Sequence, residues 1–326
     1  MDRKLRVLVI GKTKEWVPQW LAREDVELVG LVDAHREPDR YEGVPEFEDL
    51  ETALGTASFD LVAMATPPWA KTPMALVERL ARLGHDVYLQ KLRPPEPDAG
   101  ETLLALAEET GRTIAIGEAY RYDPAIRAAR RWIEEGALGD VFEIEWNCRR
   151  ENLDAAWASA YRHVMLEDLT YHHAGAIHAL LGVRWERVYA WSWTPSWSIE
   201  PNTNAAILAV ADNGVRLQYT ATWAASAELT PWLGDFRLEG AKGSLRYEGG
   251  RLTLRGRDGE ERFSGPAAET ADGGPVGVAG IVDDYIRSVR ASRRTAHDIR
   301  DMIPALRLVE AALRSASERQ ETSGKG

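Results

Sequence analysis

Two short segments of the sequence carry side chains that could move a proton near neutral pH. Asp168 and His172 lie four residues apart in a stretch with helical spacing, so they share one helix face and can touch. A carboxylate beside an imidazole fixes its tautomer and raises its basicity, as a general acid or base requires. Lys91 directly follows a buried strand pattern, where burial disfavours an ammonium ion, although a lysine that reaches solvent is the alternative. These three residues are the catalytic candidates, and we expect their segments to meet at one crevice.

Further side chains near these segments are candidates for binding a substrate. His173 falls within an apolar helical stripe, which favours packing or a supporting contact over direct chemistry. Arg121 and Tyr122 are weaker candidates for the wall of the same crevice. The substrate-binding candidates are therefore Lys91, Arg121, Tyr122 and His173.

The first part of the sequence predicts a unit that binds dinucleotides. A strand, a glycine-containing turn, a helix and a second strand that ends at Asp33 follow one another. Pyrophosphate binds free N–H groups at a helix N-terminus, and a later carboxylate accepts the adenosine ribose hydroxyls. Asp33 lies 22 residues after Gly11 and would repel the 2′-phosphate of NADP. NAD is the predicted cofactor, and Arg36 keeps NADP open.

The glycine turn departs from the usual G-x-G-x-x-G pattern, because residues 11–16 keep only the first glycine. Thr13 limits the approach of the backbone to pyrophosphate, and Trp16 prevents close helix–strand packing unless the loop adopts another shape. Lys12 and Lys14 could offset this loss by contacting phosphate. The alternative is a solvated basic turn in a domain that has lost its cofactor. The predicted cofactor-binding residues are Gly11, Lys12, Thr13, Asp33, Thr66, Pro67, Pro68, Trp69 and Gln90.

The elements that must position these residues divide into two groups. Short β-branched runs alternate with helical patterns up to residue 116, which predicts a parallel sheet covered on both faces. The expected strands are 5–10, 26–32, 61–65, 87–90 and 113–116. Helices are expected in the gaps between these strands. Two further helices are expected from about 97 to 109 and after Pro124. The fold class is α/β plus α+β, beginning with a Rossmann-type dinucleotide-binding domain over residues 1–119.

Beyond Val141 the pattern changes to longer alternating strands, broken by one helix over 166–181. Turn signals at 212–214 and 248–250 predict hairpins and a mostly antiparallel sheet. Residues 256–278 are rich in Gly, Pro and charge and are expected to form a loop, followed by helices near 279–291 and 298–318. Residues 120–326 are therefore predicted as an α+β domain for substrate binding and oligomerisation.

Composition excludes several classes of protein. The chain has 326 residues, enough for two domains, and a net charge of −11, which argues against a nucleic-acid or anionic-membrane partner. The apolar run at the start is short and has no cleavage site, so it reads as a strand, and no run is long enough to span a membrane. The single cysteine, Cys148, fits a reducing cytoplasm. The histidines at 163–173 lack a tight ligand spacing, so we predict no metal site.

Aromatic residues are concentrated in one part of the predicted second sheet. Six of the twelve tryptophans lie between residues 185 and 232. Tyr189, Trp191 and Trp193 project from one strand face. They could stack on sugar rings, but burial against another subunit is favoured, which predicts a homo-oligomer, a dimer or tetramer.

Three segments resemble one known family over almost the whole chain. The most specific runs from Gly117 to Pro124 and on to Gly139, and two others are residues 238–245 and 65–68. They are similar to the glucose-fructose oxidoreductase / inositol dehydrogenase (Gfo/Idh/MocA) family. The resemblance implies a Rossmann domain followed by a domain built on an open-faced sheet. The family's Glu-Lys-Pro motif falls on Gln90, Lys91 and Leu92, so only the lysine is kept.

The family's Asp-x-x-x-His pair falls on Asp168 and His172, both kept, whereas its later acidic residue is Gly175 here. The resemblance implies hydride transfer between NAD(P) and a secondary carbinol of a sugar, polyol or related small molecule. His172 would take the hydroxyl proton, Asp168 would orient it, and Lys91 would hold the reacting oxygen. The main alternative is a catalytically inactive family member that binds a ligand or acts in assembly. A metal-dependent lyase or hydrolase is a third.

Overall fold

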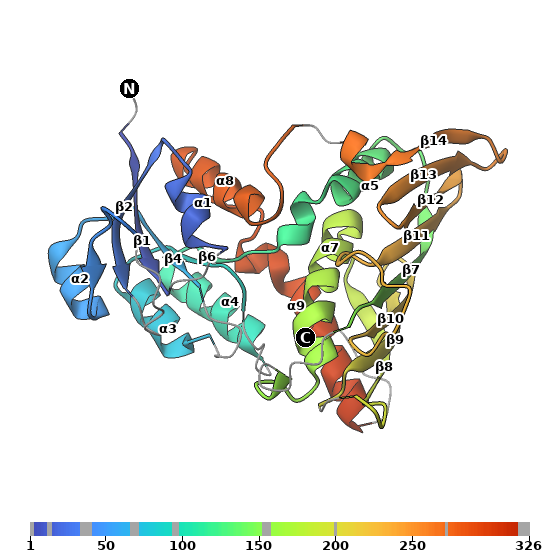
Figure 1. The fold of residues 1–326 in the computed structure, drawn as a ribbon, viewed down its shortest axis with the longest axis horizontal. Helices are drawn as coiled ribbons and strands as arrows, with labels where there is room; N and C mark the ends of the chain where they lie inside the picture. Colours follow the sequence, from blue (N-terminus) through green and yellow to red (C-terminus); the bar gives the residue numbers. More distant parts are fainter. Residues whose placement is uncertain are drawn as a thin grey trace. The chain divides into compact units, whose positions relative to one another are not determined.

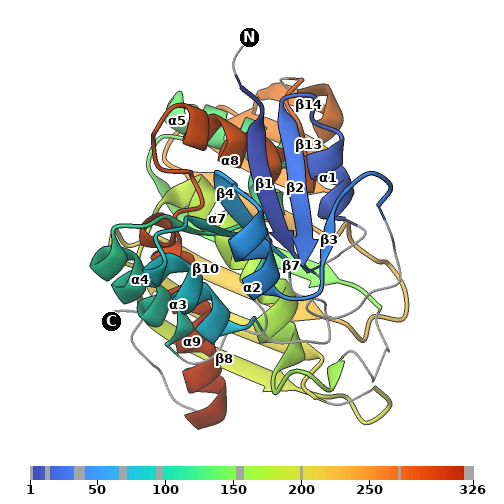
Figure 2. The ribbon, with the colours of Figure 1, turned by 90° about the vertical axis from the view of Figure 1, so that its left-hand side faces the viewer.

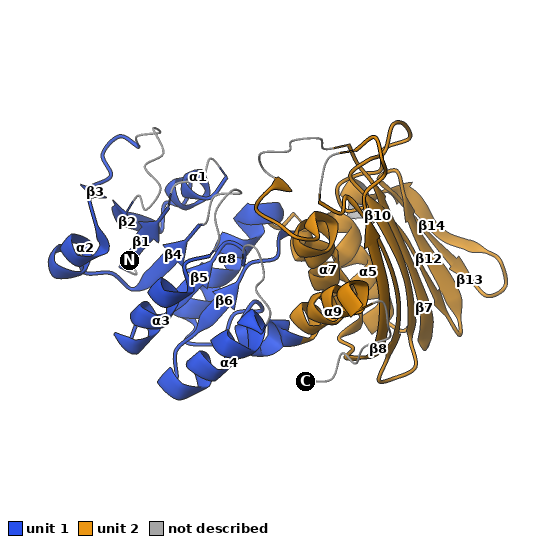
Figure 3. Ribbon diagram, turned by 90° about the horizontal axis from the view of Figure 1, so that it is seen from below, with its two compact units in different colours: residues 1–119, 275–303 blue, residues 120–274, 304–326 orange. Residues whose placement is uncertain are grey.

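The computed structural model describes residues 3–11, 15–32, 41–65, 72–92, 98–151, 158–198, 201–270 and 273–318. The chain forms two compact units (Figure 3). The first comprises Met1–Ala119 and Pro275–Ile303, and the second comprises Tyr120–Gly274 and Pro304–Gly326. The sequence prediction divided the chain once, after residue 119. The structure places a segment near the end of the chain, residues 275–303, with the first unit instead.

The first unit is built on six parallel strands, in the order β3-β2-β1-β4-β5-β6. They are β1 (Leu5–Ile10), β2 (Val26–Val32), β3 (Glu46–Phe47), β4 (Leu61–Met64), β5 (Val87–Leu89) and β6 (Ile114–Ile116). Most of these residues are buried, as expected for strands covered on both faces. This order is that of a dinucleotide-binding doubly wound sheet, which confirms the Rossmann-type fold predicted from the sequence.

Helices cover both faces of this sheet (Figures 1 and 2). α2 (Leu50–Thr56), α3 (Met74–Arg82) and α4 (Ala99–Thr110) lie on one face, and α1 (Val17–Leu21) and α8 (Gly277–Arg290) lie on the other. Trp16 packs on Trp20 with ring centroids 5.4 Å apart and on Tyr285 of α8 at 6.3 Å. The Tyr285 hydroxyl donates to the Leu89 carbonyl at the end of β5 (3.2 Å). α8 therefore completes the core of the first unit, a long-range contact that no local sequence pattern signals.

The second unit is built on eight strands, in the order β14-β13-β12-β11-β7-β10-β9-β8. They are β7 (Val141–Arg149), β8 (Trp185–Trp193), β9 (Asn204–Ala211), β10 (Arg216–Thr222), β11 (Asp235–Gly240), β12 (Gly243–Glu248), β13 (Arg251–Gly256) and β14 (Glu261–Pro266). β7 and β10 pair in parallel, whereas the other neighbouring pairs are antiparallel. The mostly antiparallel sheet predicted from the sequence is therefore confirmed.

The prediction of a loop over residues 256–278 is wrong for part of that range. Residues 261–266 form β14, which pairs with β13, and Ala267–Thr270 form a 3₁₀ turn. β14 is an edge strand, and its exposed charged residues Glu261 and Arg262 are a common way to protect such an edge. Its composition therefore resembles that of a loop.

Helices cover only one face of this second sheet in the described part of the chain (Figures 1 and 3). They are α5 (Pro124–Glu134), α7 (Tyr171–Leu181) and α9 (Ile299–Glu318), the first turn of which belongs to the first unit. Along β10, Leu217, Tyr219 and Ala221 are buried while Gln218 is exposed. We call the helix-covered side the inner face and the other side the outer face. The outer face is the open face that the resemblance implied.

Candidate active site

His172 is the second residue of α7, in the second unit, and its ring is half-buried. Two tyrosine rings pack against it, that of Tyr120 at 5.5 Å and that of Tyr171 at 5.3 Å between centroids. The helix ends at Gly182, whose positive φ of 62° suits a C-terminal cap. The imidazole is therefore held in a fixed orientation at the helix start and remains partly accessible.

The segment before α7 is a π-helix rather than an α-helix. It spans Met165–Thr170, and all six of its residues are buried. The Glu167 carboxylate accepts backbone N–H groups from Arg162 (2.7 Å) and His163 (2.6 Å), which fixes the chain at its start. Such π segments are rare and often occur at functional sites. The single helix predicted over 166–181 is thus two successive helical forms, with Asp168 in the first and His172 in the second.

Asp168 is buried, with 8% of its surface exposed, and accepts a hydrogen bond from the Tyr161 hydroxyl (3.2 Å). This bond holds the carboxylate in place. The sequence did not point to Tyr161, which precedes the π segment in the chain. The one available signal was its position seven residues before Asp168.

His173, proposed from the sequence as a substrate-binding candidate, is completely buried. Its Nε2 lies 3.0 Å from the Trp232 carbonyl, and its Nδ1 lies 2.8 Å from the Tyr219 hydroxyl. A carbonyl can only accept, so Nε2 carries the proton and Nδ1 accepts from Tyr219, which accepts from Thr170 (3.0 Å). Burial lowers the pKa of His173 to about 3 and raises that of Tyr219. His173 is a neutral packing residue beneath the site, which corrects its assignment as a substrate contact.

The two other second-unit candidates differ in exposure. Arg121 is half-buried, whereas Tyr122 is buried and packs under the Arg127 guanidinium at 5.4 Å. Tyr122 therefore packs at the start of α5, and its ring has little surface left to contact a substrate. Tyr120 is the residue of this segment that contacts His172, and it was not among the sequence candidates.

In the first unit, several candidates lie in one row at the carboxyl edge of the sheet. Backbone N–H groups of Ala65 and Gln90 continue the ladder to Ile10 (2.9 Å) and Met64 (2.8 Å), so Gly11, Ala65 and Gln90 follow neighbouring strands. Gly11 has φ of +78°, and a Cβ there would lie 2.1 Å from the Ala65 carbonyl oxygen. Lys91 comes next in the chain and is only 4% exposed. This row lies where open α/β sheets bind their ligands.

The helix after the glycine turn is short. α1 has five residues, and fully buried Trp16 occupies its N-cap position. Trp16 thus packs between helix and core rather than leaving room for close helix–strand contact. Seven of the predicted cofactor-binding residues lie outside the described residues: Lys12, Thr13, Asp33, Thr66, Pro67, Pro68 and Trp69.

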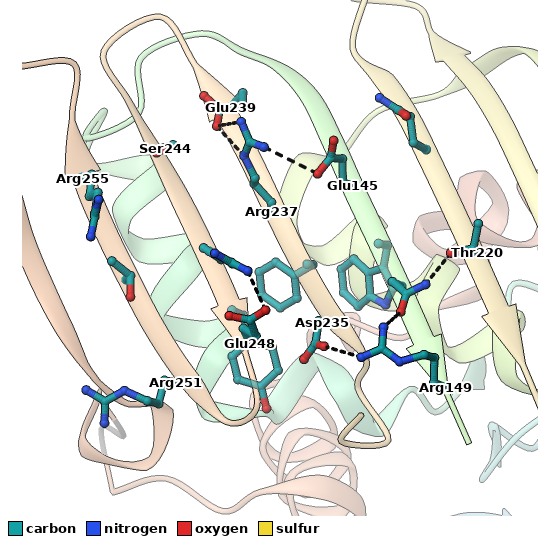
Figure 4. Close-up of a pocket in the computed structure, with 17 residues that line it drawn as sticks. Glu145, Arg149, Thr220, Asp235, Arg237, Glu239, Ser244, Glu248, Arg251 and Arg255 are labelled. Carbon is teal, nitrogen blue, oxygen red and sulfur yellow. Dashed lines mark hydrogen bonds and ion pairs between the residues drawn. The ribbon is translucent and has the colours of Figure 1, made fainter. Parts of the chain in front are cut away.

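A concave groove of about 860 Å³ lies on the outer face of the second sheet and contains none of these candidates (Figure 4). Its charged side chains pair with one another, as Arg237 does with Glu239 and Glu145. Within the described ranges no group of three or more His, Cys, Asp and Glu side chains could hold a metal ion. No helix in those ranges has the length and apolar character to span a bilayer.

The architecture described above combines a Rossmann-type unit with a unit built on a mostly antiparallel sheet. Residues 126–246 match the family model described as the GFO/IDH/MocA C-terminal domain. Inositol 2-dehydrogenase of Rhizobium meliloti is 24% identical over 163 residues, which cover 48% of each protein, so the match spans about half of that relative. The matched segment is thus similar to the C-terminal domain of the Gfo/Idh/MocA family.

Solved structures share the fold over nearly the full chain. An oxidoreductase from Agrobacterium radiobacter, in complex with NAD+, L-tartaric acid and magnesium, superposes with a TM-score of 0.83 at 20% identity, covering 98% of both chains. The WlbA dehydrogenase from Bordetella pertussis, in complex with NADH and UDP-GlcNAcA, gives 0.81 at 20% identity and covers 99% and 98%. At this identity the likeness establishes the fold.

Proposed function

We propose that the chain is an NAD(P)-dependent dehydrogenase or reductase that acts on a secondary carbinol of a sugar, polyol or related small molecule. The observation that carries the proposal is the half-buried imidazole of His172, packed between two tyrosine rings on a helix whose preceding π turn holds the buried Asp168 carboxylate. The match to the GFO/IDH/MocA C-terminal domain and the names of the relatives, which include inositol 2-dehydrogenase and D-apiose dehydrogenase, support it.

Each catalytic residue has one role in the oxidation direction. His172 accepts the proton of the substrate hydroxyl, and Asp168 orients the imidazole and supports the charge it gains. The Lys91 ammonium holds the reacting oxygen and stabilises its developing negative charge. The cofactor supplies hydride acceptance at the nicotinamide ring, so the carbinol carbon loses a hydride while its oxygen loses a proton.

The described part of the first unit fits a dinucleotide. Gly11 leaves no room for a Cβ at the end of β1, which lies beside the point where the strand order reverses. Gly11 and Gln90 would lie under the cofactor, and Lys12, Thr13, Asp33 and residues 66–69 are proposed as its other contacts. NAD is favoured over NADP because of Asp33. The short α1 supports the alternative of an inactive family member that binds a ligand or acts in assembly.

The test compares His172→Ala with His178→Ala, a matched control on the same helix. A panel of sugars and polyols is screened for turnover with NAD+ and NADP+. Loss of the general base is expected to lower kcat by about 10²-fold or more in His172→Ala and to leave His178→Ala unchanged. Quenching of tryptophan fluorescence by NADH should be the same in all three proteins.

Two results would contradict the proposal. Undiminished turnover in His172→Ala would remove that residue from the mechanism. The absence of saturable quenching by either NADH or NADPH at millimolar concentration would favour the inactive alternative.

A further inference from the structure

Two successive arginines at the end of β7 have very different partners. Arg149 donates to the Asn147 side chain (2.5 Å) and lies 3.7 Å from the Asp235 carboxylate, on the outer face (Figure 4). Arg150 instead stacks over the Trp232 ring, with Cζ 4.4 Å from the ring centroid, and donates to the Thr230 carbonyl (2.7 Å). Arg149 is paired with a carboxylate, whereas Arg150 has no carboxylate partner among the described residues.

The Arg150 guanidinium is half-buried and pairs with no carboxylate of a described residue. Its Nε–H is buried, and no acceptor in the described chain bonds to it. A partly desolvated guanidinium with no carboxylate partner and one unsatisfied N–H is destabilised, and an anionic ligand would offset this cost through charge-assisted hydrogen bonds.

The surface beneath Arg150 is held rigidly. The Trp232 carbonyl accepts two hydrogen bonds, from the Tyr120 hydroxyl (3.2 Å) and from His173 Nε2 (3.0 Å). The indole ring packs edge-on against Trp223 with centroids 5.4 Å apart, yet it is 48% exposed. An exposed aromatic ring beside a fixed guanidinium suits a molecule with an apolar ring face and an anionic substituent. The fixed backbone lowers the entropy lost on binding.

Tyr120 joins this surface to the catalytic candidate. Its hydroxyl bonds to Trp232, and its ring packs against His172. All of these residues belong to the second unit. Tyr120 thus contacts both His172 and Trp232, the residue on which Arg150 stacks, so one ligand could engage both Arg150 and His172.

We propose that Arg150, held on Trp232, binds an anionic group of the substrate, a carboxylate or a phosphate. The substrate of the dehydrogenase is then an acidic sugar, a hydroxy acid or a sugar phosphate rather than a neutral sugar. This inference rests on the proposed function, because it takes the ligand at His172 to be the substrate. Arg150 sets specificity, and the proton transfer still belongs to His172.

The experiment measures binding by tryptophan fluorescence without cofactor, so it does not depend on turnover. The probes are D-glucuronate, D-galacturonate, L-tartrate, glucose 6-phosphate and inorganic phosphate, against D-glucose and D-galactose. At least one anionic probe should bind about tenfold or more tightly than its neutral counterpart, and Arg150→Gln should abolish this preference. Arg149→Gln, the matched control, should keep it.

The separate arms identify the anion. Preference for the uronates or tartrate indicates a carboxylate, and preference for glucose 6-phosphate indicates a phosphate. Arg150→Lys, which keeps the charge but loses the planar fork, should retain only part of a carboxylate preference. Unchanged melting temperature and neutral-sugar affinity in Arg150→Gln would show that the variant is folded.

The proposal is overturned if neutral probes bind as tightly as all anionic ones, if no anionic probe binds, or if Arg150→Gln weakens neutral and anionic probes equally. Arg150-dependent anion binding in a protein that shows neither NADH binding nor turnover would contradict the proposed function alone. The inference that Arg150 binds an anion would then stand.

Discussion

At the scale of single residues, the second unit contains a chain of hydrogen bonds in which each donor and each acceptor is fixed. Thr170 donates to Tyr219, Tyr219 to His173, and His173 to the Trp232 carbonyl. Only the neutral imidazole can both accept from Tyr219 and donate to Trp232. Protonation of His173 would replace an acceptor by a donor at a fully buried site, which is the physical reason why its pKa falls to about 3.

This pKa makes stability depend on pH. In the unfolded chain His173 titrates near its ordinary pKa of 6.5, so below that pH the unfolded state binds a proton that the native state does not. The free energy of unfolding is therefore expected to fall as pH drops from about 6.5, by up to ~1.4 kcal/mol per pH unit from this residue. His173→Gln should flatten that slope, as measured by urea unfolding at several pH values between about 7.5 and 5. His163, whose burial also lowers its pKa, is present in both proteins and cancels in the comparison. Equal slopes would contradict the assignment.

Sequence reasoning at this scale proposed Lys91, Asp168 and His172 as catalytic residues but did not point to the residues that contact Asp168 and His172 in the structure. Tyr161, Tyr120 and Trp232 come from other segments and contact the site only after folding. Apart from the seven-residue spacing of Tyr161 from Asp168, their type and spacing carry no local signal, because an aromatic residue in a loop or turn fits many environments. The same reasoning misjudged His173, whose place in the apolar stripe was the better guide to its burial.

At the scale of elements, the buried strands were predictable because a parallel sheet covered on both faces demands unbroken apolar runs. The predicted bounds of β1 and β2 match the structure. β3 has only two residues, which is too short to give a sequence pattern. In the structure, its Phe47 ring packs against β2 in the space that a side chain at Gly30 would occupy. The π-helical turn before α7 could not be predicted either, because apolar spacing analysed at the α-helical period does not distinguish a π-helical turn from an α-helical one.

The end of β1 tests how tightly the cofactor turn is built. Gly11 and Gly43 share a φ of +78°, but a Cβ would meet the Ala65 carbonyl at 2.1 Å in the first case and nothing within 4 Å in the second. Gly43→Ala is expected to lose about 1–2 kcal/mol of stability from the left-handed backbone alone. Gly11→Ala should lose about 1–3 kcal/mol more, because backbone must shift at a packed edge, and should weaken NADH binding. Urea unfolding and fluorescence titration measure both effects. Equal losses in the two variants would show that the edge of the sheet yields easily.

At the scale of the whole molecule, the outer face of the second sheet combines two kinds of surface. Trp191, Trp193 and Leu208 on β8 and β9 are 57%, 46% and 59% exposed. The groove on the same face is lined by charges of both signs, such as the pair of Arg246 and Glu248 (Figure 4). Exposed aromatic clusters of this kind favour protein contacts. A surface that carries both charges can pair with a copy of itself about a twofold axis.

We therefore expect this outer face to bind a second copy of the chain, as the aromatic pattern in the sequence suggested. Trp191→Glu places a charge in the apolar part of the face and should shift the protein toward monomer, because burying an unpaired carboxylate opposes association. Leu83→Glu, at a 54% exposed leucine of the first unit, is the matched control and should leave the mass unchanged. Sedimentation velocity at several concentrations distinguishes the species. A wild-type chain that sediments as a monomer, or a Trp191→Glu variant with the wild-type mass, would exclude this face as the self-association surface and leave the aromatic residues to another partner.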